Sequence, residues 1–370
     1  MHRVIPMRDS CIARRNAFLL PGIWFMAGLS RALPGVAMRM LLVNELGVQP
    51  AEQAILGVWG SLPWNFKMLM AFLSDTVPIC GRRRSPYLGA GLALQLFAFS
   101  TLASYRPTAS TLGPLDFMQA CGMVAVGTMS DTLIVESMKR EHSGKDTFGN
   151  LQTNCWIAMF VGSLVGNAIS GYAYEGLSTS GVFTVTALLK LAMLCLPAAV
   201  VDPAGHRVSC AVSGGLTAKY CEVIDGCDDP RVWKPMLFIF AFAACPHNGD
   251  AWNSFLYGRR ELATTANATA AAGSGAAIQP LGLPEATLGW VGVVTTVSQV
   301  AGAASYRFFL KRVPLRRLFV VIVVASSALQ CTQLILITRT NTLLGLPDVA
   351  FALGDDAVIE VSRELLAMPM

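Results

Sequence analysis

The chain has 370 residues, of which 54% are hydrophobic and 14% are charged, and its mean hydropathy is +0.52. A soluble protein carries about 25% charged residues, so this composition excludes a water-soluble globule of this size. The net charge of +5 does not by itself indicate a nucleic-acid partner, because basic residues in a membrane protein first report its topology. The apolar residues form continuous runs, which predicts an all-α, polytopic membrane protein and disfavours an outer-membrane barrel.

Ten apolar stretches follow one another along the chain, and a spanning helix needs about 20 such residues. They cover residues 17–43, 51–73, 86–105, 113–137, 150–173, 181–201, 233–257, 286–310, 316–338 and 348–370. Arginines precede the first stretch, but no cleavage site follows a short apolar core. We therefore expect a retained spanning helix rather than a cleaved signal peptide.

Basic residues are distributed unevenly over the connections between these stretches. If the N-terminus is cytosolic, the cytosolic segments contain most of the lysines and arginines. The opposite loops then contain only Arg106, Arg259, Arg260 and Arg339. Because cytosolic loops of membrane proteins are enriched in basic residues, this asymmetry predicts a cytosolic N-terminus and an even number of spanning helices.

The longest cytosolic connection covers residues 202–232 and divides the chain into two parts. We predict an N-terminal six-helix bundle over residues 1–201 and a partial C-terminal bundle of four helices over residues 233–370. A central loop after six helices is the plan of the major facilitator transporters, which are built from two repeated halves. Two arginine-rich loops support this symmetry, since one follows the second helix (residues 74–86) and the other the eighth (residues 306–317).

Charged side chains inside the apolar stretches mark candidate sites, because a charge in the bilayer is costly unless it is paired or faces water. The candidates for substrate binding or coupling are Arg31, Asp131, Glu136, Asp250 and Asp355. They fall in the first, fourth, seventh and tenth stretches. The corresponding helices of a major facilitator protein line its central cavity, so the pattern predicts a water-filled path.

Two interpretations stay open for the charges in the first and fourth stretches. Arg31 is a candidate for binding a substrate carboxylate, because a guanidinium binds carboxylates through two parallel hydrogen bonds; the alternative is an internal ion pair with Asp131. Asp131 and Glu136 are candidates for proton or cation coupling, or for contact with a polar ring. The alternative for Glu136 is a structural contact with Lys139 or Arg140.

A further charged group, Lys67, Asp75, Arg82, Arg83 and Arg84, lies at the cytosolic end of the second stretch. We interpret it as a gating motif, and the alternative is a solvated charge run that sets topology. No nucleotide-binding or hydrolase motif occurs in the sequence. The ten cysteines lack the spacing of a zinc site. We therefore expect no metal, no cofactor and no enzymatic activity, and transport that draws on a gradient.

The segment Leu62–Tyr87 resembles the hallmark of the folate–biopterin transporter family, a branch of the major facilitators. The matching residues are Pro63, Trp64, Lys67, Ser74, Asp75, Pro78, Gly81, Arg83 and Arg84. Asp131 and Glu136 match the family's acidic pair in the fourth helix, and Gly149, Leu151 and Gln152 match the start of the fifth. Residues 309–316 and 345–355 are similar too, so the resemblance covers nearly the whole chain.

The resemblance implies a secondary active transporter of folates and biopterin-type pteridines that works by alternating access with proton coupling. Arg31 would bind the anionic group, and Asp131 would contact the pterin ring or carry the proton. Asp75 and the neighbouring arginines would latch the cytosolic side. The expected partners are the lipid bilayer, the small-molecule substrate and a coupling proton.

The chain also departs from the family pattern. The family has twelve helices and this chain about ten, so we expect a chain that is truncated at its C-terminus. Gly127 replaces an acid that is common in the fourth helix, which affects the expected substrate or coupling. The alternatives are a transporter of another organic solute, such as a sugar, nucleoside or drug, or a truncated membrane protein that does not transport. The short leader favours the plasma membrane over a plastid envelope.

Overall fold

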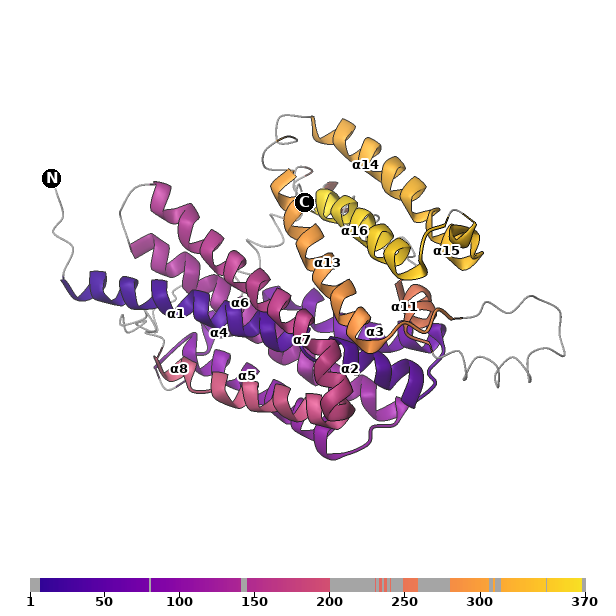
Figure 1. Cartoon of the computed structure of the whole chain (residues 1–370). Coiled ribbons are helices and arrows are strands. Elements are labelled where there is room, and N and C mark those ends of the chain that lie inside the picture. Colours follow the sequence, from indigo (N-terminus) through magenta and orange to yellow (C-terminus); the bar gives the residue numbers. More distant parts are fainter. Residues whose placement is uncertain are drawn as a thin grey trace. The chain divides into compact units, whose positions relative to one another are not determined.

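The computed structural model of the chain describes residues 7–79, 81–140, 145–199, 249–258, 280–305, 309, 314–343 and 345–367, with isolated positions between 230 and 240. In these ranges the regular elements are helices, and an isolated β-bridge joins Ile79 to Arg82 in a turn. The all-α prediction is therefore confirmed for the described part of the chain (Figure 1).

The helices fall into an N-terminal half (α1–α8) and a C-terminal half (α11–α16). The N-terminal half contains α1 (Met7–Ala32), α2 (Gly35–Met40), the π-helical turn η1 (Leu41–Glu45), α3 (Pro50–Asn65), α4 (Lys67–Thr76), α5 (Ser85–Ser104), α6 (Ala109–Arg140), α7 (Lys145–Met193) and α8 (Leu196–Ala199). The C-terminal half contains α11 (Gly249–Tyr257), α13 (Glu285–Ser305), α14 (Leu315–Gln330), α15 (Gln333–Ile337), the 3₁₀ turn η3 (Thr340–Thr342) and α16 (Asp348–Ala367). Each of the ten predicted stretches contains at least part of one of these helices.

The helices are interrupted at places that the hydropathy pattern does not mark. The first predicted span is divided at Pro34, which has no N–H to donate and precedes α2. The second is divided at Phe66 into α3 and α4. The fifth and sixth spans are joined in α7, whose one non-helical residue is Ser178 at φ 60°. A positive φ is uncommon for a residue other than glycine, so Ser178 marks the corner between two spans.

Within the described residues, six segments are long and apolar enough to cross a membrane by length and composition. They are Leu19–Glu45, Ser85–Ser104, Ala109–Glu136, Leu151–Ala198, Glu285–Ser305 and Val320–Ile337. The α3–α4 pair and α16 are not among them, because Lys67 begins α4 directly after the break and α16 carries several acids. The described helices are those of an integral, multi-pass membrane protein.

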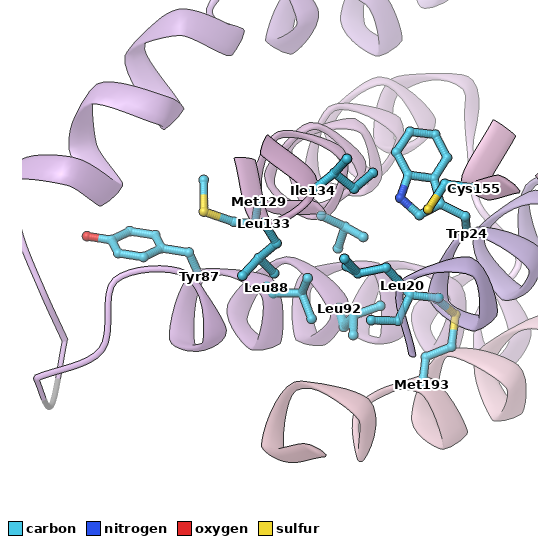
Figure 2. Packing of buried hydrophobic residues seen from close by; sticks show 12 residues of the cluster. Leu20, Trp24, Tyr87, Leu88, Leu92, Met129, Leu133, Ile134, Cys155 and Met193 are labelled. Carbon is cyan, nitrogen blue, oxygen red and sulfur yellow. The ribbon is translucent and has the colours of Figure 1, made fainter. Parts of the chain in front are cut away.

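The largest apolar cluster of the N-terminal half joins α1, α5, α6 and α7. Leu20 and Trp24 of α1 pack there with Leu88, Leu92 and Met129, as Figure 2 shows. Leu20, Leu88 and Met129 have no exposed surface. This packing fixes the rotation of α1 and α6 and therefore decides which way their charged residues point.

Small residues bring α1 and α7 into close backbone contact. A Cβ atom added at Gly28 would clash with the carbonyl group of Met159, and one added at Gly162 would clash with that of Phe25. Close approach of this kind is the usual role of glycine between membrane helices. The α1–α7 pair is consequently a rigid unit on which both Trp24 and Arg31 are mounted.

The two halves are joined by α7 and α13. The Asn167 side chain donates hydrogen bonds to the Gly292 carbonyl oxygen and the Thr296 hydroxyl, each at 3.0 Å. Nearby, a Cβ atom added at Gly171 would clash with the Glu285 carbonyl oxygen. These contacts lie toward the end of the bundle that carries Ser178. Arg82–Arg84 lie at the opposite end, which we name the arginine-rich end.

Candidate functional site

Arg84 organises the charged group at the arginine-rich end. Its Nη2 donates to Asp75 Oδ1 at 2.6 Å and to Glu136 Oε1 at 2.7 Å, and its Nη1 donates to the Ser74 hydroxyl. Its side chain is 5% exposed. Burial lowers the pKa of the Arg84 guanidinium, but the hydrogen bonds and charges of Glu136 and Asp75 raise that pKa above its usual value. The guanidinium therefore ties α4 and α6 to the start of α5.

The three neighbouring arginines of this group are not equivalent. Arg84 is buried between two carboxylates, whereas Arg82 is exposed and Arg83 is partly exposed. Gly81 begins the turn that leads into them, and its φ of 72° is one that glycine adopts without strain. Glu136, which the sequence pattern grouped with the substrate or coupling residues, contacts Arg84; the side chains of Lys139 and Arg140 lie outside the described residues.

Lys67 and Asp131 form a second ion pair, between α4 and α6. Lys67 Nζ lies 2.8 Å from Asp131 Oδ2, and both side chains are about two-fifths exposed, at 41% and 42%. The Lys67 ammonium also lies 6.0 Å from the centre of the Trp64 ring, within reach of a cation–π interaction. Asp131 is thus paired with Lys67 and not with Arg31, so the internal ion pair that we considered for Arg31 does not form.

Arg31 lines an open cavity of about 400 Å³ formed by residues of α1, α2, α3, α5 and α6. The polar side chains of its lining are Arg31, Arg39, Gln53, Asp116 and Gln119, and the remaining lining residues are mostly apolar. Among the described residues, Arg31 makes no ion pair. A cavity with a few polar groups in an apolar lining has the character of a small-molecule site.

Asp116 and Arg39 are cavity residues that the sequence analysis did not select. The Asp116 carboxylate lies against Gly60 of α3, where a Cβ atom would overlap it. Each of these two residues is a charge inside an apolar stretch, as Arg31 is, so the rule that selects Arg31 also applies to them. Lys190 is another charge inside an apolar stretch that the sequence analysis did not select. It is 4% exposed, and its Nζ donates to the Ser30 hydroxyl at 2.7 Å.

The acids of α16 make their contacts within the C-terminal half. Asp355 accepts a hydrogen bond from the Thr332 hydroxyl, and Asp356 accepts one from the Trp252 indole at 2.9 Å. Asp250 lies in α11, and its side chain lies outside the described residues. The predicted residues thus separate into the Arg84 group, the Lys67–Asp131 pair, the Arg31 cavity and the acids of α16. Over the described ranges, no group of side chains is suited to hold a metal ion.

Two solved structures resemble this chain in fold. The nucleoside transporter NupG aligns over 95% of this chain and 80% of its own, with a TM-score of 0.63 and 11% identity. A D-xylose-proton symporter aligns over 97% of this chain and 81% of its own, with a TM-score of 0.59 and 14% identity. At this identity the likeness shows the fold, which is the major facilitator fold that the chain's plan predicted.

Relatives are recognised from sequence as well. The "Folate-biopterin transporter" of Synechocystis sp. is 30% identical over 94% of this chain, and this chain spans 65% of that protein's length. "Folate transporter 2" of Plasmodium falciparum is 23% identical over 94% of this chain and 70% of its own length. These relatives are named as transporters and not as enzymes. The family model described as "BT1 family" matches residues 27–370, and the chain belongs to this family.

Proposed function

We propose that the chain transports folates and biopterin-type pteridines across a membrane. The family match over residues 27–370 and the names of the relatives from Synechocystis and Plasmodium falciparum support this substrate class. The observation that carries the proposal at the residue level is the Arg31 guanidinium, exposed in a cavity of about 400 Å³ without an ion-pair partner among the described residues. Folates carry carboxylates, which a guanidinium binds through charge-assisted hydrogen bonds.

The coupling and gating roles are part of the same proposal. Protonation of Asp131 would remove the charge that holds Lys67 and so loosen α4 from α6, which makes this pair the proposed coupling element. The Arg84 group is the proposed latch of alternating access, because it joins the ends of three helices. Asp250 and Asp355 are the proposed coupling residues of the C-terminal half. We further propose a cytosolic N-terminus and a plasma-membrane location.

Uptake by proteoliposomes that contain the purified chain tests the substrate and the role of Arg31. We expect saturable uptake of labelled folate and biopterin, with unlabelled nucleosides and sugars as weak competitors. The Arg31→Ala variant should raise the KM for folate about tenfold or more, because a charge-assisted hydrogen bond is lost. The matched control is Arg106→Ala, which removes an exposed arginine from a loop. No uptake of either compound, or equal KM values for both variants, would contradict the proposal.

The coupling role of Asp131 requires a separate measurement. An inwardly directed proton gradient should accelerate folate uptake by the wild-type chain, and the Asp131→Asn variant should lose this acceleration. The carboxamide keeps the shape of the side chain but cannot carry the proton. Unchanged uptake and unchanged dependence on the gradient in Asp131→Asn would exclude this role.

A further inference from the structure

Trp156 of α7 is an exposed aromatic side chain on the face that α7 turns toward the C-terminal half. It is 43% exposed. Asn167 and Gly171, which contact α13, follow it by about three and four helical turns, so all three residues lie on one face of the helix. Trp156 lies about 16 Å along the axis from Asn167, toward the arginine-rich end.

Two other aromatic rings pack against Trp156. The Trp24 ring centre lies 5.3 Å away, at an interplanar angle of 52°, and the Phe160 ring centre lies 6.1 Å away. Trp24 is buried, and its indole N–H has no acceptor in the described part of the chain. A ring supported in this way loses little conformational entropy when a ligand stacks on its exposed side.

A charged pair lies next to these rings. Cys155 precedes Trp156 and packs in one apolar cluster with Trp24 of α1 and with Ile134 of α6, which follows Asp131 by three residues. Asp131 uses Oδ2 for Lys67, and its Oδ1 has no partner among the described residues. With a side chain 42% exposed, this carboxylate can accept hydrogen bonds from a ligand.

We propose that Trp156 is a stacking surface for a planar heteroaromatic ring, and that Asp131 accepts hydrogen bonds from the N–H groups at the edge of that ring. The inference rests on the proposed function and identifies the ring as the pteridine of the substrate. A pteridine presents a flat π-face together with an amino group and a ring N–H on one edge. Stacking on an exposed indole and hydrogen bonding to a carboxylate satisfy these two features.

The position of Arg31 agrees with a ligand that carries carboxylates at its other end. Trp24 and Arg31 are seven residues apart on α1, which places them on the same face and about 10 Å apart along the helix axis. A folate joins its pteridine ring to its carboxylates through an aminobenzoyl spacer. One molecule can therefore stack on the aromatic cluster and extend toward the guanidinium.

Binding measurements on the purified full chain in detergent micelles test the stacking role. Three probes compete with labelled folate: unlabelled folate, biopterin, which has the ring without the carboxylate tail, and p-aminobenzoylglutamate, which has the tail without the ring. Trp156→Ala should weaken folate and biopterin binding about tenfold, the usual effect of losing one stacked aromatic partner. Direct titration should show unchanged binding of p-aminobenzoylglutamate. Trp156→Phe should restore ring binding to within about twofold, because phenylalanine also stacks.

The matched control is Phe97→Ala, which removes an aromatic side chain that is 57% exposed on α5. It should leave the binding of all three probes unchanged. The inference is overturned if Trp156→Ala binds folate and biopterin as the wild-type chain does, or if it loses all three probes equally. In either case the proposed function remains supported if the Arg31→Ala variant binds folate more weakly than the wild-type chain does. Failure of the wild-type chain to bind any probe overturns the proposed function, and the stacking role with it.

Discussion

Replacement of Arg84 by methionine should destabilise the protein through its arginine-rich end. The guanidinium is 5% exposed and bonds two carboxylates and the Ser74 hydroxyl. Methionine fills much of the same volume but leaves Asp75 and Glu136 without their shared cation. The two negative charges then lie close together with nothing between them to offset their repulsion.

The size of the effect follows from the burial of the three side chains. Removing one partner of a fully buried ion pair costs about 3–5 kcal/mol. Here the Asp75 and Glu136 side chains are 41% and 32% exposed, so water can solvate them after the change. We therefore expect the free energy of unfolding to fall by about 2 kcal/mol, between the values for a buried and an exposed pair. Arg84→Lys should fall between wild type and Arg84→Met, because one ammonium cannot reproduce the fork of a guanidinium.

Unfolding of the purified chain by sodium dodecyl sulfate in mixed micelles, followed by circular dichroism, measures this free energy. The matched control is Arg82→Met, which removes an exposed arginine from the same loop and should change it by less than about 0.5 kcal/mol. Equal free energies of unfolding for Arg84→Met and the wild-type chain would contradict this prediction. Equal losses in Arg84→Met and Arg82→Met would contradict it too.

Two further predictions use the same unfolding measurement. Lys190→Met should leave the free energy of unfolding unchanged or raise it. It removes a buried cation that has no carboxylate partner among the described residues, and this gain offsets the lost hydrogen bond to Ser30. A loss of more than about 2 kcal/mol would contradict this prediction. Gly171→Leu should lower it by about 1–3 kcal/mol, because the added atoms clash with the Glu285 carbonyl group of α13. Gly176→Leu is its control, since a Cβ atom at Gly176 has no neighbour within 4 Å in the described part of the chain. Equal losses in the two glycine variants would show that the α7–α13 contact is not the cause.

The positions of the helices could be predicted from sequence with few errors, and the errors have identifiable causes. Hydropathy reports which residues are apolar, but it does not report a change in backbone direction inside an apolar run. The break at Pro34 has a sequence signal, which is the missing N–H of proline. The corner at Ser178 has none, because serine rarely adopts a positive φ without tertiary support.

The candidate site was predicted less completely than the fold. Counting charges in apolar stretches identified Arg31, Asp131 and Glu136, and the same rule applied to every stretch would have included Asp116 and Lys190. Sequence spacing could not predict the partners of these residues. The pairing of Asp131 with Lys67 depends on how α4 and α6 are rotated about their axes and how close they lie.

The amino-acid sequence was sufficient to predict an integral membrane protein, the course of its ten apolar stretches and the family to which it belongs. These properties depend on short segments, because a spanning helix must match the thickness of the bilayer and a motif is read along the chain. Packing of the helices decided that Arg84 joins Asp75 to Glu136, that Lys67 holds Asp131, and that Arg31 shares a cavity with Asp116. Residues distant in the chain meet only when apolar contacts and close glycine packing set the rotation and separation of the helices that carry them.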